Sequence, residues 1–190
     1  FSAIITRFFS AIISSLLVSL HDVSGPDIKI RIREATSKDL NLLIGFINDI
    51  AEFEGLSDEV SFNREELHDS LFGISNTAEA IIAENQGDAV GFAVYFQNFS
   101  TFKGKPGLYL EDLFVKPEWR KHGIGRALLV RLAQIAVERG CPRFEWVALD
   151  WNQNAIDFYE KLGAKQLNDW RIFRMEGDSI AQLATQVIDN

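Results

Sequence analysis

The chain has 190 residues, of which 47% are hydrophobic and 15 are Phe, and its 19 basic and 27 acidic side chains give a formal net charge of −8. This length fits one domain, and the apolar content excludes a globally disordered protein. The acidic balance argues against a nucleic-acid-binding protein, which needs clustered Lys and Arg. The single cysteine, Cys141, excludes a disulfide framework and a cysteine-based zinc site, and the three histidines are scattered. We expect a cytoplasmic protein with no metal.

Residues 1–20 differ from the rest of the chain. They hold 13 apolar residues and five serines, with Arg7 as the single charge. The apolar residues recur every four positions, which is typical of one face of a helix, but the uncharged run over 8–20 is too short for a membrane span. We expect an extension outside the domain, such as a leader or a translated upstream stretch, joined by a linker at 21–27. The alternative is a helix that docks on a partner, on the domain itself or on a membrane surface.

The first half of the remaining chain predicts strands and helices in alternation. Thr36 and Asp39 have the spacing of a capping box, and the apolar residues after them follow a helical period up to about Phe53. The residues at 85–88, Asn-Gln-Gly-Asp, predict a hairpin turn. The expected elements are a strand at 29–33, a helix from 36 to 53, a shorter helix at 63–71, and hairpin strands at 80–84 and 89–96.

The second half continues the alternation. Gly140 and Pro142 predict the end of one helix, and Gly163 predicts the end of another. The expected elements are a strand at 108–115, a helix at 125–139, a strand at 144–150, a helix at 154–162, and a final strand pair at 165–168 and 171–175. Hairpins with interspersed helices predict a mixed sheet in an α/β or α+β domain over 28–190.

Eight carboxylates fall between Asp49 and Asp69, against Arg64 as the one basic residue. Such a run is usually a solvated face, and the alternative is an attractive rim for a cationic ligand.

The segment from Arg120 to Ala127 lies between a predicted strand and a predicted helix. A helix N-terminus has free N–H groups and a partial positive charge, so it binds phosphate readily. Gly123 and Gly125 would let the main chain approach a pyrophosphate closely. The segment lacks the Gly-Lys-Ser/Thr of a Walker loop and the third glycine of a dinucleotide fingerprint. An ordinary loop before a helix is the alternative.

Several motifs in a fixed order identify a family resemblance. They are Tyr109-Leu110-Glu111-Asp112-Leu113-Phe114-Val115, Arg120-x-x-Gly-x-Gly, Asp150-Trp151-Asn152-x-Asn154-Ala155, Phe158-Tyr159 and Leu162-Gly163-Ala164. Together they resemble the GNAT acetyltransferase superfamily, and within it the spermidine/spermine (diamine) and thialysine N-acetyltransferase branch. The resemblance covers about 28–190, including Ile32-Arg33-x-Ala35-Thr36 and Phe53-Glu54. It implies the GNAT fold, in which a mixed, mostly antiparallel sheet is splayed between two central strands and flanked by helices.

The resemblance implies acetyl-CoA as cosubstrate, bound in the splay between the strands at 108–115 and 144–150. The implied contacts to the pantetheine arm are Leu113, Phe114 and Val115. Those to the pyrophosphate are Arg120, Lys121, His122, Gly123, Ile124, Gly125 and Arg126. Those near the thiol end are Asn152, Gln153, Asn154 and Ala155. One departure is Lys121, which stands where many members have glycine.

Two residues match catalytic positions of the family. Glu111 would accept the proton of the substrate amine, directly or through water, because an ammonium with a pKa of ~10.4 is a scarce nucleophile at neutral pH. Its alternative is a surface glutamate, and Asp112 should point to the opposite face of the strand. Tyr159 would protonate the departing thiolate, with a core aromatic as its alternative. A backbone N–H near Leu113 would polarise the thioester carbonyl.

The expected activity is direct acetyl transfer to the primary amine of a small cation, such as a polyamine, a diamine or a thialysine-like amino acid. The residues at 149–153 favour the thialysine-acetylating members. The matching substrate positions are Phe53, Glu54, Glu111, Glu145, Trp146 and Val147. The branch implies a homodimer. Acetylation of a peptide or protein amine and a non-catalytic acyl-CoA-binding domain are the alternatives.

Overall fold

A computed structural model describes residues 28–186, so the expectations for residues 1–27 lie outside the described residues. The chain divides into two compact units, Phe1–Val147 and Ala148–Asn190, and each is described here by itself. Within the described residues, no helix combines the length and the apolar character that crossing a membrane requires.

The first unit is built on a sheet whose strand order follows the chain, β1-β2-β3-β4-β5. Neighbouring strands are antiparallel from β1 to β4, and β5 is parallel to β4. This sheet confirms the predicted mixed, mostly antiparallel fold class. The strands are β1 (Ile30–Glu34), β2 (Glu79–Asn85), β3 (Asp88–Ser100), β4 (Lys105–Val115) and β5 (Phe144–Glu145).

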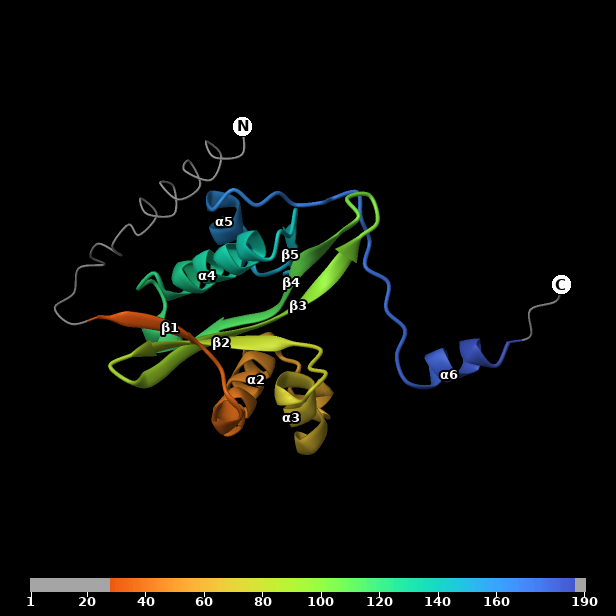
Figure 1. The fold of residues 1–190 in the computed structure, drawn as a ribbon, viewed down its shortest axis with the longest axis horizontal. Helices are drawn as coiled ribbons and strands as arrows, with labels where there is room; N and C mark the ends of the chain where they lie inside the picture. The colour runs from red at the N-terminus through yellow and green to blue at the C-terminus, as the bar shows by residue number, and fades with distance from the viewer. Residues whose placement is uncertain (1–27, 187–190) are drawn as a thin grey trace, which may run out of the picture. The chain divides into compact units, whose positions relative to one another are not determined.

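Helices cover both faces of this sheet. Figure 1 shows α2 and α3 on one face and α4 on the other. Their bounds are α2 (Leu40–Glu54), α3 (Arg64–Phe72) and α4 (Ile124–Glu138), with short 3-10 turns η1 (Ser37–Asp39), η2 (Ser57–Glu59) and η3 (Pro117–Trp119). The second unit contains α5 (Gln153–Lys161) and α6 (Asp178–Ala184).

Local chemistry fixes where several elements begin. The predicted capping box is present, because the Thr36 N–H donates to Asp39 Oδ2 at 2.8 Å ahead of α2. Asn63 Oδ1 caps α3 by accepting hydrogen bonds from the N–H groups of Glu65 and Glu66. In the β2–β3 turn, Gln86 and Gly87 both have positive φ, 53° and 95°. That pair of left-handed residues gives the tight hairpin that the sequence predicts.

The core between the sheet and α2 is aromatic. The Phe46 ring of α2 stacks on the Phe92 ring of β3, with centroids 5.0 Å apart and planes 4° from parallel. Val94 and Phe114 belong to the same cluster, so the side chains of 92, 94 and 114 define the α2 face of the sheet. The alternation of a strand then assigns its neighbours to one face or the other.

The strand predictions for two regions, 144–150 and 165–175, are wrong. The strand expected at 144–150 is only β5, since its ladder with β4 consists of Leu108–Phe144 and Tyr109–Glu145. The strand pair expected at 165–168 and 171–175 is absent from the described residues, and α6 was not predicted. Aromatic and branched residues such as Ile172 and Phe173 favour a strand, but a strand also needs a neighbouring backbone to pair with. The sequence pattern does not indicate which backbone lies beside this segment.

Candidate active site

A β-bulge in β4 organises the candidate active site. Val94 of β3 pairs with Asp112, and the next residue, Tyr95, pairs with Leu110, so Glu111 is the extra residue of β4. The bulge interrupts the alternation of side chains. Asp112 lies two residues from Phe114 and therefore shares the α2 face of the sheet. Regular alternation would point Asp112 to the opposite face of the strand from Glu111, but the bulge removes that alternation at these two residues, and the charge of Glu111 acts on Asp112.

Three carboxylates meet at this bulge, which we call the carboxylate cluster: Glu54, Glu111 and Asp112. Burial is the main reason why the pKa of Asp112 is raised to about 6, and the negative charges of Glu111 and Glu54 raise it further. Burial also raises the pKa of Glu54, the last residue of α2. Like charges held together favour a proton or an incoming cation, and either one would neutralise them.

Arg120 joins the end of α2 to the end of β4. Its guanidinium lies 4.4 Å from the centroid of the Phe53 ring and 5.6 Å from that of Phe114. Its Nε donates a 3.0 Å hydrogen bond to the Val115 carbonyl. The contacts of Arg120 among the described residues thus position the glycine-containing loop that follows it.

An open hollow of about 420 Å³ lies beside this arginine. Asp49 and Glu52 are the members of the acidic run that line it, and they face the basic side chains Lys116 and Arg120. The full lining is Asp49, Glu52, Phe53, Phe114, Lys116, Pro117, Glu118 and Arg120. Two residues of the acidic run therefore line a hollow that also contains cations, and the role of the run as a rim for a cationic ligand stays a prediction.

The loop before α4 has the backbone of an anion site. Lys121 and Gly123 both adopt left-handed conformations, with φ of 66° and 77°, and Gly123 is the N-cap of α4. Alternating φ signs at the start of a helix turn successive N–H groups into one concavity that attracts anions. Within this loop His122 Nδ1 is buried and has no hydrogen-bond partner among residues 28–186. The left-handed φ at 121 also explains why glycine suits that position.

The edge of β4 next to this loop is open in the described residues. Its ladder with β5 covers only Leu108 and Tyr109, so the β5 side of 110–115 has no paired strand there. Among the remaining predicted substrate residues, Glu145 lies opposite Tyr109, Trp146 packs on Phe144 with ring centroids 4.9 Å apart, and Val147 is 52% exposed.

The second unit holds the other predicted residues. Asn152 caps α5, and its Oδ1 accepts a 3.3 Å hydrogen bond from the Ala155 N–H. Gln153 donates to Asp157, and Asn154 is exposed. Tyr159 is half-buried, with its ring centroid 5.4 Å from that of Phe158. The carboxylate cluster and the loop before α4 both lie in the first unit, and Asn152–Tyr159 belong to the second.

Comparisons with known proteins identify the family of this chain. The family model described as acetyltransferase (GNAT) family matches residues 47–164. Thialysine N-epsilon-acetyltransferase of Bos taurus is 37% identical over 166 residues, which is 82% of this chain and 97% of the relative. L-ornithine N5-acetyltransferase NATA1 of Arabidopsis thaliana is 40% identical over 104 residues, which is 54% of this chain and 46% of the relative. An integron cassette protein from the mobile metagenome of V. cholerae superposes with a TM-score of 0.69 at 28% identity, covering 85% of this chain and 100% of that one.

The chain therefore belongs to the GNAT acetyltransferase family. Within that family it is an N-acetyltransferase.

Proposed function

We propose that this enzyme transfers the acetyl group of acetyl-CoA directly to the primary amine of a small cationic substrate. The observation that carries the proposal is the carboxylate cluster of Glu54, Glu111 and Asp112, in which burial and mutual repulsion raise the pKa of Asp112. An ammonium ion relieves that repulsion, so the cluster attracts the substrate's charged end.

Acetyl-CoA fits the other half of the first unit. The open edge of β4 at Leu113, Phe114 and Val115 can hydrogen-bond an amide-containing arm as a strand would. The N–H concavity from Lys121 to Arg126 suits the pyrophosphate. Bound there, acetyl-CoA supplies the thioester carbonyl that the amine attacks. A backbone N–H near Leu113 would stabilise the negative charge that develops on that carbonyl oxygen.

The protein's own groups handle the protons. Asp112 and Glu54 hold the ammonium, and Glu111, which is exposed at the bulge, takes one of its protons directly or through water. The free amine forms the new N–C bond as the C–S bond breaks, and the Tyr159 hydroxyl gives its proton to the departing thiolate. The amide nitrogen then loses its second proton, through water, to the Tyr159 phenolate, which restores the hydroxyl. In the second unit, Asn152 to Ala155 would line the thiol end. The role of Tyr159 rests on the family motif Phe158-Tyr159 within α5.

The negative charge of the carboxylate cluster and the names of the relatives support the substrate class. The relatives named for thialysine and L-ornithine support a diamino acid, and one named spermidine/spermine N(1)-acetyltransferase-like protein 1, from Homo sapiens, supports a polyamine or diamine. Phe53, Glu54, Glu111, Glu145, Trp146 and Val147 are the proposed substrate contacts.

A homodimer in the cytoplasm is the proposed form of the enzyme. The homodimer is proposed from the resemblance to the spermidine/spermine and thialysine branch, whose members the resemblance implies to be homodimers.

The experiment is an assay of CoA release from acetyl-CoA with thialysine, lysine, ornithine, 1,4-diaminobutane, spermidine and a basic peptide. Saturable turnover on a small amine is the expected result. Turnover on the peptide alone would assign a peptide amine as the substrate. Acetyl-CoA that raises the melting temperature without turnover on any amine would indicate an acyl-CoA-binding domain and overturn the proposal.

A further inference from the structure

A second polar cluster lies on the same face of the sheet as the carboxylate cluster. Glu145 Oε2 accepts a 3.0 Å hydrogen bond from Asn98 Nδ2 and lies 2.8 Å from Arg143 Nε. Glu145 pairs with Tyr109 across β4 and β5, and Asn98 pairs with Gly107 across β3 and β4. Register and alternation place all of these residues on the α2 face, beyond the part of it that Phe46 covers.

Neighbouring residues fix the geometry of this cluster. A Cβ at Gly107 would collide with Asn98 Oδ1 and lie 2.9 Å from Arg143 Cγ, so only glycine allows both side chains to cross the strand there. Arg143 Nη2 also donates a 3.0 Å hydrogen bond to the Phe99 carbonyl. These contacts hold the carboxylate and the guanidinium side by side.

Both charged groups keep binding capacity. The side chains of Arg143 and Glu145 are 35% and 32% exposed. Arg143 Nε lies close to Glu145, but the geometry of its N–H is not that of a hydrogen bond. Arg143 Nη1 makes no hydrogen bond within residues 28–186. Glu145 likewise uses Oε2 for both contacts and leaves Oε1 available. A ligand carrying one carboxylate and one ammonium would complement this pair.

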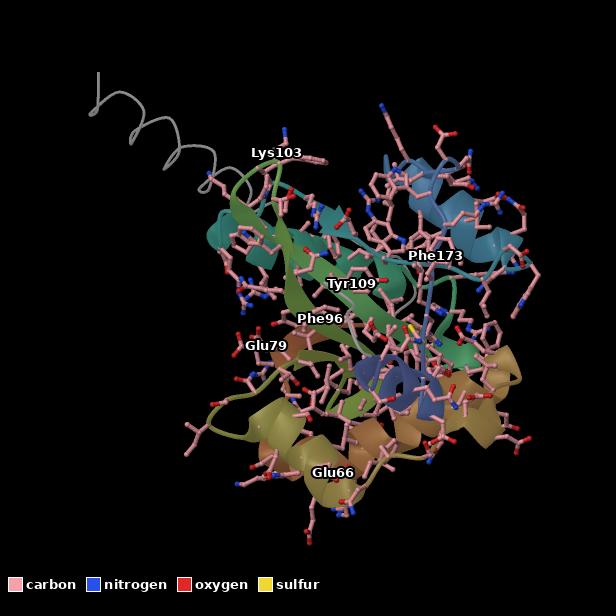
Figure 2. All side chains as sticks on the ribbon, turned by 90° about the vertical axis from the view of Figure 1, so that its right-hand side faces the viewer. Glu66, Glu79, Phe96, Lys103, Tyr109 and Phe173 are labelled. Carbon is pink, nitrogen blue, oxygen red and sulfur yellow. The ribbon has the colours of Figure 1, made fainter. Side chains whose placement is uncertain are left out.

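An aromatic floor connects the two clusters. Phe96 and Tyr109 face each other on neighbouring strands with ring centroids 5.0 Å apart, and Figure 2 shows them side by side in the sheet. From Tyr109 to Asp112 the strand advances three residues, one of which is the bulge, and Glu145 lies one strand spacing to the side of Tyr109, so the backbones of Glu145 and Asp112 are roughly 8–11 Å apart and their side chains span part of that distance. The two amino groups of an extended lysine-like molecule are ~7 Å apart, given six bonds of standard length.

We propose that Arg143 and Glu145 bind the α-carboxylate and α-ammonium of a diamino acid, while its side-chain amine lies at the carboxylate cluster. This assignment rests on the proposed function and specifies its substrate: the enzyme prefers diamino acids to diamines of the same length. Phe96 and Tyr109 then contact the methylene chain between the two ends.

The test compares substrates that differ only by the carboxylate: lysine with 1,5-diaminopentane, and ornithine with 1,4-diaminobutane. For Arg143→Gln, we expect the KM for the amino acid to rise at least about tenfold, the size expected for a lost charged hydrogen bond. The KM for the matched diamine should change less than about twofold, and kcat should be unchanged for both. Glu145→Gln should raise the KM for both members of each pair.

The ratio of the KM for the amino acid to the KM for the matched diamine is measured on one enzyme preparation. Partial unfolding of a variant therefore does not affect this ratio. Arg143→Lys should restore part of the preference for the amino acid. Arg131→Gln is the matched control, because Arg131 pairs with Glu138 on α4 and should leave the ratio unchanged. Equal effects of Arg143→Gln on amino acid and diamine would overturn the inference while the proposed function stands. Absence of wild-type turnover on every amine would instead overturn the proposed function, and the inference with it.

Discussion

Asp39 and Asp112 are both aspartates of the first unit, but their surroundings have opposite effects on their charge. Asp39 accepts two 2.8 Å hydrogen bonds from the Arg33 guanidinium, which hold the pKa of its carboxyl well below the usual range. Arg33 also binds Glu84, so this group ties β1, η1 and β2 together. No cation is among the groups that shift the pKa of Asp112. Burial and the charges of Glu111 and Glu54 raise that pKa to about 6.

The difference separates a structural charge from a functional one. A carboxylate with its partner in place stabilises the fold, whereas a buried carboxylate beside like charges costs stability unless a ligand brings the missing charge. A site that destabilises the free protein and is neutralised by its substrate is typical of enzymes. Five predictions test this contrast.

The largest expected effect is on turnover. Glu111→Gln should lower kcat by about 10²–10⁴-fold, because the neutral amide cannot accept the ammonium proton. The KM for the amine should change much less, since Asp112 and Glu54 remain. Steady-state CoA release at pH 8 measures both constants, with Glu138→Gln on the exposed surface of α4 as control. A kcat within twofold of wild type would remove Glu111 from the mechanism.

Asp112→Asn should raise the KM for the amine by about 10–100-fold, because a buried charge that binds the ammonium is lost. In the wild type, kcat/KM should fall as the pH decreases through about 6, where Asp112 becomes protonated. The variant should lose that inflection. An unchanged KM together with an unchanged pH profile would contradict a cation-binding role for Asp112.

The same Asp112→Asn variant should be more stable than the wild type at pH 7.5. The folded pKa of about 6 lies above that of an unfolded aspartate, so the native state binds more protons between pH 4 and 6 and loses stability as the pH rises through that window. The full cost above pH 6 is about 2–3 kcal/mol. Urea unfolding at pH 7.5 should show this gain, and at pH 4 the two proteins should be nearly equal. A variant less stable than the wild type at pH 7.5 would contradict the account.

Asp39→Asn should show the opposite sign. The folded pKa of Asp39 is lowered, so its contribution to stability is present above pH ~4 and is lost as the pH falls below that value. We expect a loss of about 1–2 kcal/mol at pH 7.5 from the charged hydrogen bonds to Arg33. Arg33→Met should destabilise by a similar amount. If both variants unfold at the wild-type urea concentration, Asp39 is not a structural charge.

The smallest effect concerns the loop before α4. Lys121→Gly should stabilise the protein by about 0.5–1 kcal/mol, because a left-handed φ of 66° suits glycine better than a residue with a Cβ. Thermal unfolding measures the gain. Lys121→Ala keeps the Cβ and should give no comparable increase. Equal stabilities of the glycine and alanine variants would show that the backbone at 121 carries no such cost.

Much of the first unit follows from local sequence signals. The capping box at Thr36 and Asp39, the hairpin at 85–88 and the helix closed by Gly140 each depend on a few adjacent residues, and all are confirmed within one to three residues. The extents of β5 and of the segment at 165–175 depend instead on which backbone lies beside them. Sequence periodicity carries no such information.

Dependence on a neighbouring backbone also explains why alternation within β4 does not predict the position of the Asp112 side chain. Simple alternation puts Glu111 and Asp112 on opposite faces, but the bulge is a property of the β3–β4 register and leaves no local pattern in β4. Glu54 and Glu111, whose charges act on Asp112, were both expected from the family motifs as substrate-contacting residues. Lys121 is the converse case, because its departure from glycine is visible in the sequence and its positive φ only in the structure.

The most direct test of the carboxylate cluster is to titrate the Asp112 carboxyl by ¹³C NMR, with and without saturating lysine or thialysine. The account predicts a pKa near 6 in the free enzyme, caused by burial and the neighbouring carboxylates, and a decrease when the amine binds. A pKa near 4 that does not respond to the amine would contradict the claim that this cluster binds the substrate's ammonium.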